Sequence, residues 1–221
     1  VLFAVAVIGV IPLGRLADEL GIALPLLLGL LVLAGVYWIN LFNFMDGIDG
    51  LAGVEGVAVA AGGALLLHRV GASGALLVPL LVAGSSLGFL AWNWAPARVF
   101  MGDVGSGFLG YAIAICALGS ENRAGVSALY WAGLSAVFVL DATATLIRRR
   151  ARGERVAEAH RSHAYQRLVR AGWSHARVSG SVLLLNLALI VASWLAPLSA
   201  LGVALVLSGG AYLLVERTRP M

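Results

Sequence analysis

The sequence contains no lysine, a single cysteine and few charged residues of any kind. All 15 basic residues are arginines, and charged residues make up 12% of the 221 residues, about half the share found in an ordinary soluble domain. The lone Cys116 excludes an internal disulfide and a zinc site built from cysteines. Because the arginines lie between apolar runs and not on a soluble face, the basic balance does not predict nucleic-acid binding.

Apolar residues fill most of the chain: 61% are hydrophobic, and the mean hydropathy is +0.95. About 20 apolar residues in a helix cross the core of a bilayer. We therefore predict an all-α fold, a polytopic transmembrane helical bundle that forms one integral membrane domain over residues 1–221. The eight predicted spans are 1–13, 24–42, 52–67, 75–92, 104–119, 125–147, 179–196 and 198–215. The third is rich in Gly, Ala and Val, so we expect it to pack inside the bundle.

The arginines predict the orientation of these spans. Loops on one side of the eight spans carry 12 arginines, and loops on the other side carry three, at positions 15, 69 and 123. Excess arginine marks the cytoplasmic side of a membrane protein. The arginine-rich set comprises 43–51, 93–103, 148–178 and the tail 216–221, so 148–178 is predicted to be a cytoplasmic loop.

Polar residues recur at every third position where the second predicted span ends. Asn43, Asp46 and Asp49 follow this spacing, with Gly47 and Gly50 between and after the two acids. The glycines are expected to break the helix and let the aspartates turn toward a common point. An ordinary helix end is the alternative interpretation. An EF-hand loop is excluded, because its ligand spacing and closing Glu are absent.

A second polar segment, Phe100-Met-Gly-Asp103-Val-Gly-Ser106-Gly, begins the fifth span. A carboxylate between glycines at a helix N-terminus suits a phosphate and its Mg²⁺. By itself the pattern also fits a plain N-cap.

The segment 148–178 is the one long polar loop, and it contains Arg148-Arg149-Arg150 and then His160-Arg161-Ser-His163. Arginine can bind phosphate oxygens through two parallel hydrogen bonds, and histidine can donate to a phosphate or leaving group. A basic loop on anionic lipid is the alternative. That alternative does not account for two histidines and an arginine within four positions. His68 and His175 are interpreted as interfacial residues.

At these motifs the chain resembles the polyprenyl-phosphate N-acetylhexosamine-1-phosphate transferases, membrane enzymes that initiate bacterial cell-envelope glycans. The resemblance covers essentially the whole chain and follows the family's order. The matching pieces are Asn40-x-x-Asn43-x-x-Asp46-Gly-Ile-Asp49-Gly-Leu-Ala, Met101-Gly-Asp103-x-Gly-Ser106, Asp141-x-Thr143 with Ile147-Arg148-Arg149, and Arg161-Ser-His163.

The resemblance implies transfer of a sugar-1-phosphate from a UDP-N-acetyl amino sugar to a polyprenyl (undecaprenyl) phosphate, with release of UMP. It implies Mg²⁺, with Mn²⁺ as an alternative, held at Asn43 and Asp103. It places the protein in the bacterial inner membrane with its active site at the cytoplasmic face. The partners are the two substrates and membrane lipid, with no nucleic acid, and a homodimer is left open.

By motif position, the resemblance makes Asp46 and Asp49 a polar wall near the nucleotide and the metal, with Asp49 closest to the uracil. It assigns Arg161 and His163 to the diphosphate and the sugar. Metal and cations together would neutralise the charge that develops on the diphosphate as UMP leaves.

The chain departs from the family pattern in two places. Relatives carry a paired-Asp motif after an earlier span, and no Asp-Asp occurs here; we expect the pair to lie upstream of Val1 in an N-terminally incomplete chain. Many relatives have His-x-His-His where this chain has His163-Ala-Tyr165-Gln166, which resembles the branch that starts O-antigen or capsule-type glycans. The rival interpretations are a polytopic transporter and a catalytically inactive member of the family.

Overall fold

The computed structural model describes residues 21–155, 158, 160–195 and 200–217. Within these ranges the secondary structure is helical, with no strand, which confirms the predicted all-α class. The predicted span 1–13 lies outside the described residues. The elements are α3 (Leu24–Met45), α4 (Leu51–Arg69), the 3₁₀ turn η1 (Ser73–Ala75), α5 (Leu77–Asn93), α6 (Gly102–Ala124), α7 (Ala128–Leu134), α8 (Ala136–Ala151), α9 (Ala164–Arg170), α10 (His175–Leu195) and α11 (Ala200–Arg217).

Four of these helices, α3, α4, α6 and α10, are long and apolar enough to cross a membrane, and a bent pair, α7 with α8, could form a fifth span. Helix α5 and the segment Gly202–Val215 of α11 are apolar but shorter. The protein is therefore a multi-pass membrane protein. The predicted number of eight spans is not confirmed by the described part of the chain.

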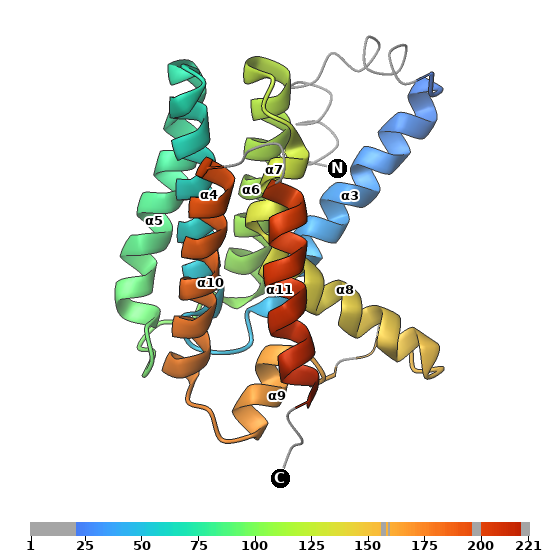
Figure 1. Ribbon diagram of the computed structural model, residues 1–221, viewed down its shortest axis with the longest axis vertical. Coiled ribbons are helices and arrows are strands. Elements are labelled where there is room, and N and C mark those ends of the chain that lie inside the picture. The colour runs from blue at the N-terminus through green and yellow to red at the C-terminus, as the bar shows by residue number, and fades with distance from the viewer. Residues whose placement is uncertain (1–20, 156–157, 159, 196–199, 218–221) are drawn as a thin grey trace.

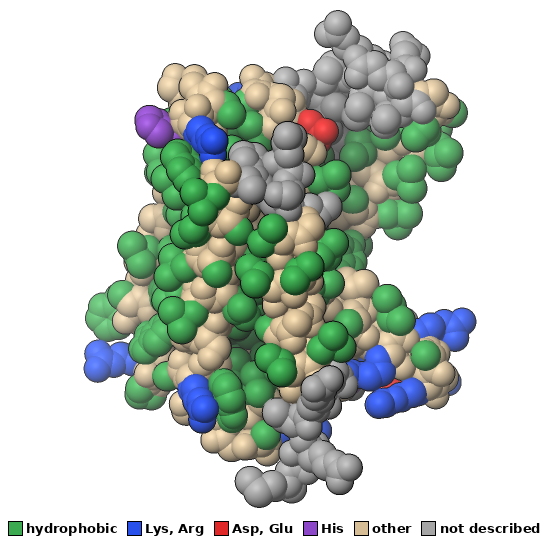
Figure 2. All heavy atoms as spheres, in the orientation of Figure 1, with side chains coloured by type: hydrophobic (Ala, Val, Ile, Leu, Met, Phe, Trp, Pro, Cys, Tyr) green, Lys and Arg blue, Asp and Glu red, His purple; other side chains and the backbone are tan. Residues whose placement is uncertain are grey.

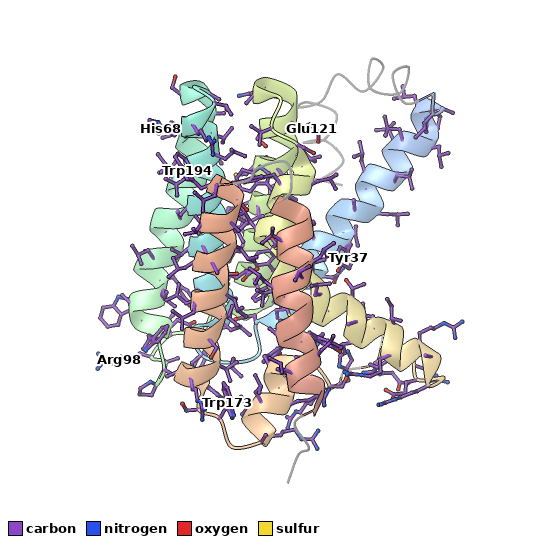
Figure 3. The ribbon with its side chains drawn as sticks, in the orientation of Figure 1. Tyr37, His68, Arg98, Glu121, Trp173 and Trp194 are labelled. Atoms are coloured by element: carbon purple, nitrogen blue, oxygen red, sulfur yellow. The ribbon has the colours of Figure 1, made fainter. Side chains whose placement is uncertain are left out.

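The helices alternate in direction, so that the loops divide between two ends of the bundle (Figure 1). His68, Glu121 and Trp194 lie toward one end, and Arg98 and Trp173 toward the other (Figure 3). Helix α9 lies at the second end, and most of the basic side chains visible in Figure 2 gather there. We call this second end the arginine-rich end. The described loops thus separate as the arginine pattern predicted.

The predicted span 125–147 is not one continuous helix. Helices α7 and α8 meet at Ser135 with a bend of 82°, and α8 runs outward toward the arginine-rich end (Figure 1). Sharp bends in helices occur at Gly/Ser pairs. Here the fully buried Ser135 lies at the break, and Gly133 precedes it by two residues. The hydropathy of the segment gave no sign of the bend, because both halves are apolar.

Helix α4 is the centre of the bundle. Of its apolar stretch, 78% is buried, compared with 17% for α3, which confirms that the predicted span 52–67 packs inside. Its glycines admit large neighbours: a Cβ on Gly56 would lie 2.8 Å from Leu109, and one on Gly63 would collide with the ring of Trp131. Trp131 is itself fully buried, and its Nε1 donates to Ser120 Oγ at 2.8 Å. Small residues let helices approach closely where lipid supplies no hydrophobic driving force between them.

We predict that Gly63→Ala destabilises the bundle by about 1–3 kcal/mol, the usual cost of overpacking a dense core. The added methyl group would overlap the indole of Trp131, which is enclosed on all sides. Thermal unfolding in detergent measures the effect, with an expected loss of several degrees. The matched control is Gly84→Ala on α5, where a Cβ meets nothing within 4 Å. Equal melting temperatures for the two variants would show that α4 and Trp131 are not tightly packed.

Candidate active site

Three segments far apart in the sequence meet at the arginine-rich end: the α3–α4 loop, the α5–α6 loop and the segment that contains α9. The hydroxyl of Tyr165 on α9 donates to the carbonyl of Phe44 at 3.0 Å. The amide of Ala97 donates to Asp49 Oδ2 at 3.1 Å. A Cβ on Gly47 would overlap the Tyr165 hydroxyl, so glycine is needed for this approach. The polar segments identified in the sequence therefore belong to one region of the molecule.

The predicted metal residues lie where α3 ends and α6 begins. Asn43, in the last turn of α3, donates its Nδ2 to Ser106 Oγ at 3.2 Å, and Ser106 Oγ in turn donates to the carbonyl of Gly102 at 3.0 Å. Asp103 is exposed in the first turn of α6. Because the Asn43 amide nitrogen is used in the hydrogen bond, its oxygen remains as an acceptor beside the Asp103 turn.

Asp46 forms the C-cap of α3 and faces the same region. Burial, and after it the negative charge of Asp103, raise the pKa of Asp46 to about 6. A carboxylate whose pKa is raised by burial and by a second carboxylate is a common feature of a site for a cation or a shared proton. This observation fits a divalent cation in this region.

The donor set is small, however. Within the described ranges, no three His, Cys, Asp or Glu side chains are grouped so as to hold a metal ion. An amide oxygen and one or two carboxylates fit Mg²⁺, which prefers oxygen ligands and usually keeps several from water and substrate phosphates. They fit zinc less well, because protein zinc sites are built mainly from Cys and His side chains.

Asp49 has different partners from Asp46, although only two residues separate them. Its Oδ2 accepts from Ala97 N and lies 3.4 Å from Nδ1 of His175. Its backbone carbonyl accepts from Ser179 Oγ at 2.7 Å. The next residue, Gly50, has a φ of +80° and donates its amide to Asn93 Oδ1 at 2.9 Å. Asp49 is therefore bonded to the α5–α6 loop and α10, while Asp46 is affected by the charge of Asp103; the turn of both aspartates toward a common point stays a prediction.

His163 is nearly inaccessible, at 2% exposure, and stands at the N-cap of α9. Its Nδ1 lies 3.4 Å from Oδ1 of the buried Asp141 on α8. Asp141 also accepts from the backbone amides of Ala164 at 2.8 Å and Tyr165 at 3.3 Å, and from Thr145 Oγ1 at 3.2 Å. A buried carboxylate is stable only with such partners, so Asp141 fixes the start of α9 and lies beside the ring of His163.

Arg161 differs from His163, with which it was paired in the prediction. It is exposed, and among the described residues no hydrogen bond or ion pair joins it to Asp46, Asp49 or Asp103. His160 is partly exposed, and its ring centroid is 4.8 Å from that of His163. Burial, and then the neighbouring His163 and Arg149, lower the pKa of His160.

The other arginines of this loop are divided between internal and surface positions. Arg148 donates to the carbonyl of Ser162 at 2.7 Å, and buried Arg149 donates to the carbonyl of Arg155 at 2.7 Å and pairs with Glu154 at 3.2 Å. The exposed Arg155 side chain pairs only with Glu158 among the described residues. Arg148 and Arg149 therefore shape the loop before His163.

An apolar cavity of about 280 Å³ adjoins the site between α8, α9, α10 and α11. Asp141 and Tyr165 are among its lining residues, and burial, followed by the charge of Asp141, raises the pKa of Tyr165. The remaining lining is mostly aliphatic and aromatic, and it includes Leu168, Trp173, Val182, Leu185, Tyr212 and Leu214.

Sequence reasoning assigned no role in the site to Tyr165 or His175, and it included Asp141 in a matching motif without giving it a role of its own. Asp141 had a usable signal, since an acid within an apolar run must face a partner inside the protein. Tyr165 and His175 had none, because their partners, Phe44 and Asp49, are more than 100 residues away.

Comparison with known proteins supports one family. The family model described as Glycosyl transferase family 4 matches residues 1–121. A probable undecaprenyl-phosphate N-acetylglucosaminyl 1-phosphate transferase of Bacillus subtilis is 37% identical over 63% of this chain and 41% of its own length. A phospho-N-acetylmuramoyl-pentapeptide-transferase of Chlamydia muridarum is 41% identical over 52% of this chain and 34% of its own length. The enzyme of the same name from Moorella thermoacetica is 33% identical over 72% of this chain and 48% of its own length. The chain thus spans less than half the length of these relatives. With more than half of its residues matched by the family model, the chain belongs to glycosyl transferase family 4.

Proposed function

We propose that the full-length protein transfers a sugar-1-phosphate, of the N-acetylhexosamine type, from a UDP-sugar to a polyprenyl phosphate at the cytoplasmic face of the bacterial plasma membrane. The acceptor oxygen forms a bond to the β-phosphorus of the UDP-sugar, and the bond from that phosphorus to the bridging oxygen breaks, releasing UMP. The observation that supports this most is the meeting of the Asn43–Asp46, Asp103 and His163 segments at one end of a membrane bundle, beside an apolar cavity.

A divalent cation, Mg²⁺ or Mn²⁺, would supply neutralisation of the diphosphate charge during transfer. Asn43 and Asp103 would hold it, since both are oxygen donors at the junction of α3 and α6. Asp46, whose pKa is raised to about 6, would form part of the polar wall near the nucleotide and the metal. Asp49, bonded to Ala97, would support the nucleotide side of the site and not the metal.

His163 would act on the diphosphate or the sugar through Nε2. Asp141 lies against Nδ1, so a proton on Nδ1 is favoured and the opposite nitrogen is left for substrate. Arg161 would contribute positive charge from its exposed position two residues earlier. An Arg/His pair is suited to the charge on the leaving UMP.

The apolar cavity would receive part of the acceptor's hydrocarbon chain. Its walls are mostly aliphatic and aromatic, and its lining includes Asp141, Tyr165 and Met45, the residue directly before Asp46. A lipid carrier needs this combination, because its phosphate must reach the polar loops while its chain stays in an apolar environment.

The transporter alternative is less well supported. Transporter acids usually sit near the middle of the bilayer in paired half-bundles. Here Asp46, Asp49 and Asp103 all lie at helix ends. The inactive-member alternative rests on the absent Asp pair and is decided by assaying the full-length protein with a radiolabelled UDP-sugar.

We predict that the full-length enzyme requires a divalent cation and that Asp103→Asn lowers kcat by at least about 10²-fold, the scale of losing an electrostatic group at the reacting phosphate. Asp103 is exposed in a first helical turn, so the variant should fold normally. The readout is sugar-1-phosphate transfer with and without chelator, together with the melting temperature. Near-normal turnover of a folded Asp103→Asn protein would refute the metal assignment.

The second prediction concerns orientation. With the arginine-rich end in the cytoplasm, Arg123→Cys should react with a membrane-impermeant thiol reagent added to intact cells, and Arg155→Cys should react only after the cells are opened. Both side chains are exposed, and the native Cys116 is buried. The reverse labelling pattern would place the site on the opposite side of the membrane from the UDP-sugars, which are cytoplasmic.

The third prediction concerns the loop. His163→Ala should lower kcat by about 10²- to 10³-fold while changing acceptor binding much less, because a group acting on developing charge stabilises the transition state beyond the ground state. Arg155→Ala is the matched control, since its exposed side chain pairs only with Glu158 within the described chain. Steady-state kinetics in nanodiscs compare the two. Equal losses would mean that the loop is a general basic surface without a special role for its histidine.

A further inference from the structure

Helix α10 has a polar face that its apolar composition conceals. His175, Ser179, Asn186 and Ser193 follow one another at intervals of four, seven and seven residues, which places them on one side of an α-helix. The last three are buried, at 0%, 1% and 2% exposure. In a membrane protein such a face turns toward partners inside the bundle.

The middle of this face is joined to α4. Asn186 Nδ2 donates to Glu55 Oε2 at 2.7 Å, and both side chains are enclosed. A hydrogen bond between two buried polar groups is costly to break, because each is then left without a partner. The bond therefore fixes the register of α10 against α4, directly after the loop that contains Asp49.

The first turn of α10 meets Asp49 itself. Ser179 Oγ donates to the Asp49 carbonyl at 2.7 Å, and His175 Nδ1 lies 3.4 Å from both the amide nitrogen and the Oδ2 of Asp49. A neutral Nδ1 can accept from the amide, and a protonated Nδ1 can donate to the carboxylate. The first form restrains the backbone of Asp49, and the second restrains its side chain.

We infer that His175 is a positioning residue for the nucleotide side of the site and acts through Asp49. This inference rests on the proposed function, in which Asp49 supports the nucleotide of the UDP-sugar. Within the described residues no hydrogen bond or ion pair joins His175 to Asn43, Asp46, Asp103 or His163, so its effect is expected on substrate binding and not on the charge that develops during transfer.

The experiment uses three substitutions of His175 in the full-length protein. His175→Ala removes the ring and is expected to raise KM for the UDP-sugar, and Kd for UMP, about tenfold, with kcat changed less than about threefold. His175→Asn places an amide atom where Nδ1 lies and should restore most of the binding. His175→Gln places its amide one bond further out and should not. His68→Ala, an exposed histidine at the opposite end, should leave both constants unchanged.

A double variant tests whether the effect passes through Asp49. The protein with both Asp49→Asn and His175→Ala should bind UMP at most about threefold more weakly than the protein with Asp49→Asn alone. The reason is that the effects of coupled residues are not additive. Fully additive losses, an unchanged KM for His175→Ala, or equal behaviour of the Asn and Gln variants would overturn the inference while the transferase assignment stands. Absence of UDP-sugar-dependent transfer by the unmodified protein would overturn the proposed function, and the inference with it.

Discussion

A polar group inside a bilayer must find its partner within the protein, and this requirement determines where chemistry can occur in this chain. Trp131 donates to Ser120, and Asn186 donates to Glu55, so the polar atoms joined within the bundle serve to hold helices together. Unpaired acids are tolerated only at helix ends, where water and cations reach them. Asp46 and Asp103 occupy such positions, at the C-cap of α3 and in the first turn of α6.

The properties that depend on local composition could be predicted from the sequence. The helical class, the enclosed position of α4 and the gathering of polar motifs at one end follow from apolar length, small residues and the spacing of arginines, each of which acts over a few turns of chain. The resemblance to a transferase family also lay in short motifs, and the match of residues 1–121 to glycosyl transferase family 4 supports it.

The properties that depend on distant partners could not be predicted. The 82° bend at Ser135 is not visible in the hydropathy, because the apolar pattern continues through it. The link from Tyr165 to Phe44 and that from Ser179 to Asp49 each join residues more than 100 positions apart. Arg161 and His163 looked alike in the sequence, yet one is exposed and the other buried, because only the histidine meets the Asp141 carboxylate.

The short loop between α3 and α4 is where these distant contacts converge, and its two aspartates have separate tasks as a result. Asp49 has its backbone and carboxylate occupied by Ala97, Ser179 and His175, so it anchors the loop. Asp46 lies beside Gly47, where Tyr165 approaches, and its pKa is raised to about 6 by burial and by Asp103. A carboxylate held in that state gains most from a neighbouring positive charge, because such a charge would favour the ionised form that burial disfavours. By anchoring the loop, Asp49 therefore keeps Asp46 in a position where a cation or a charged substrate would be stabilised.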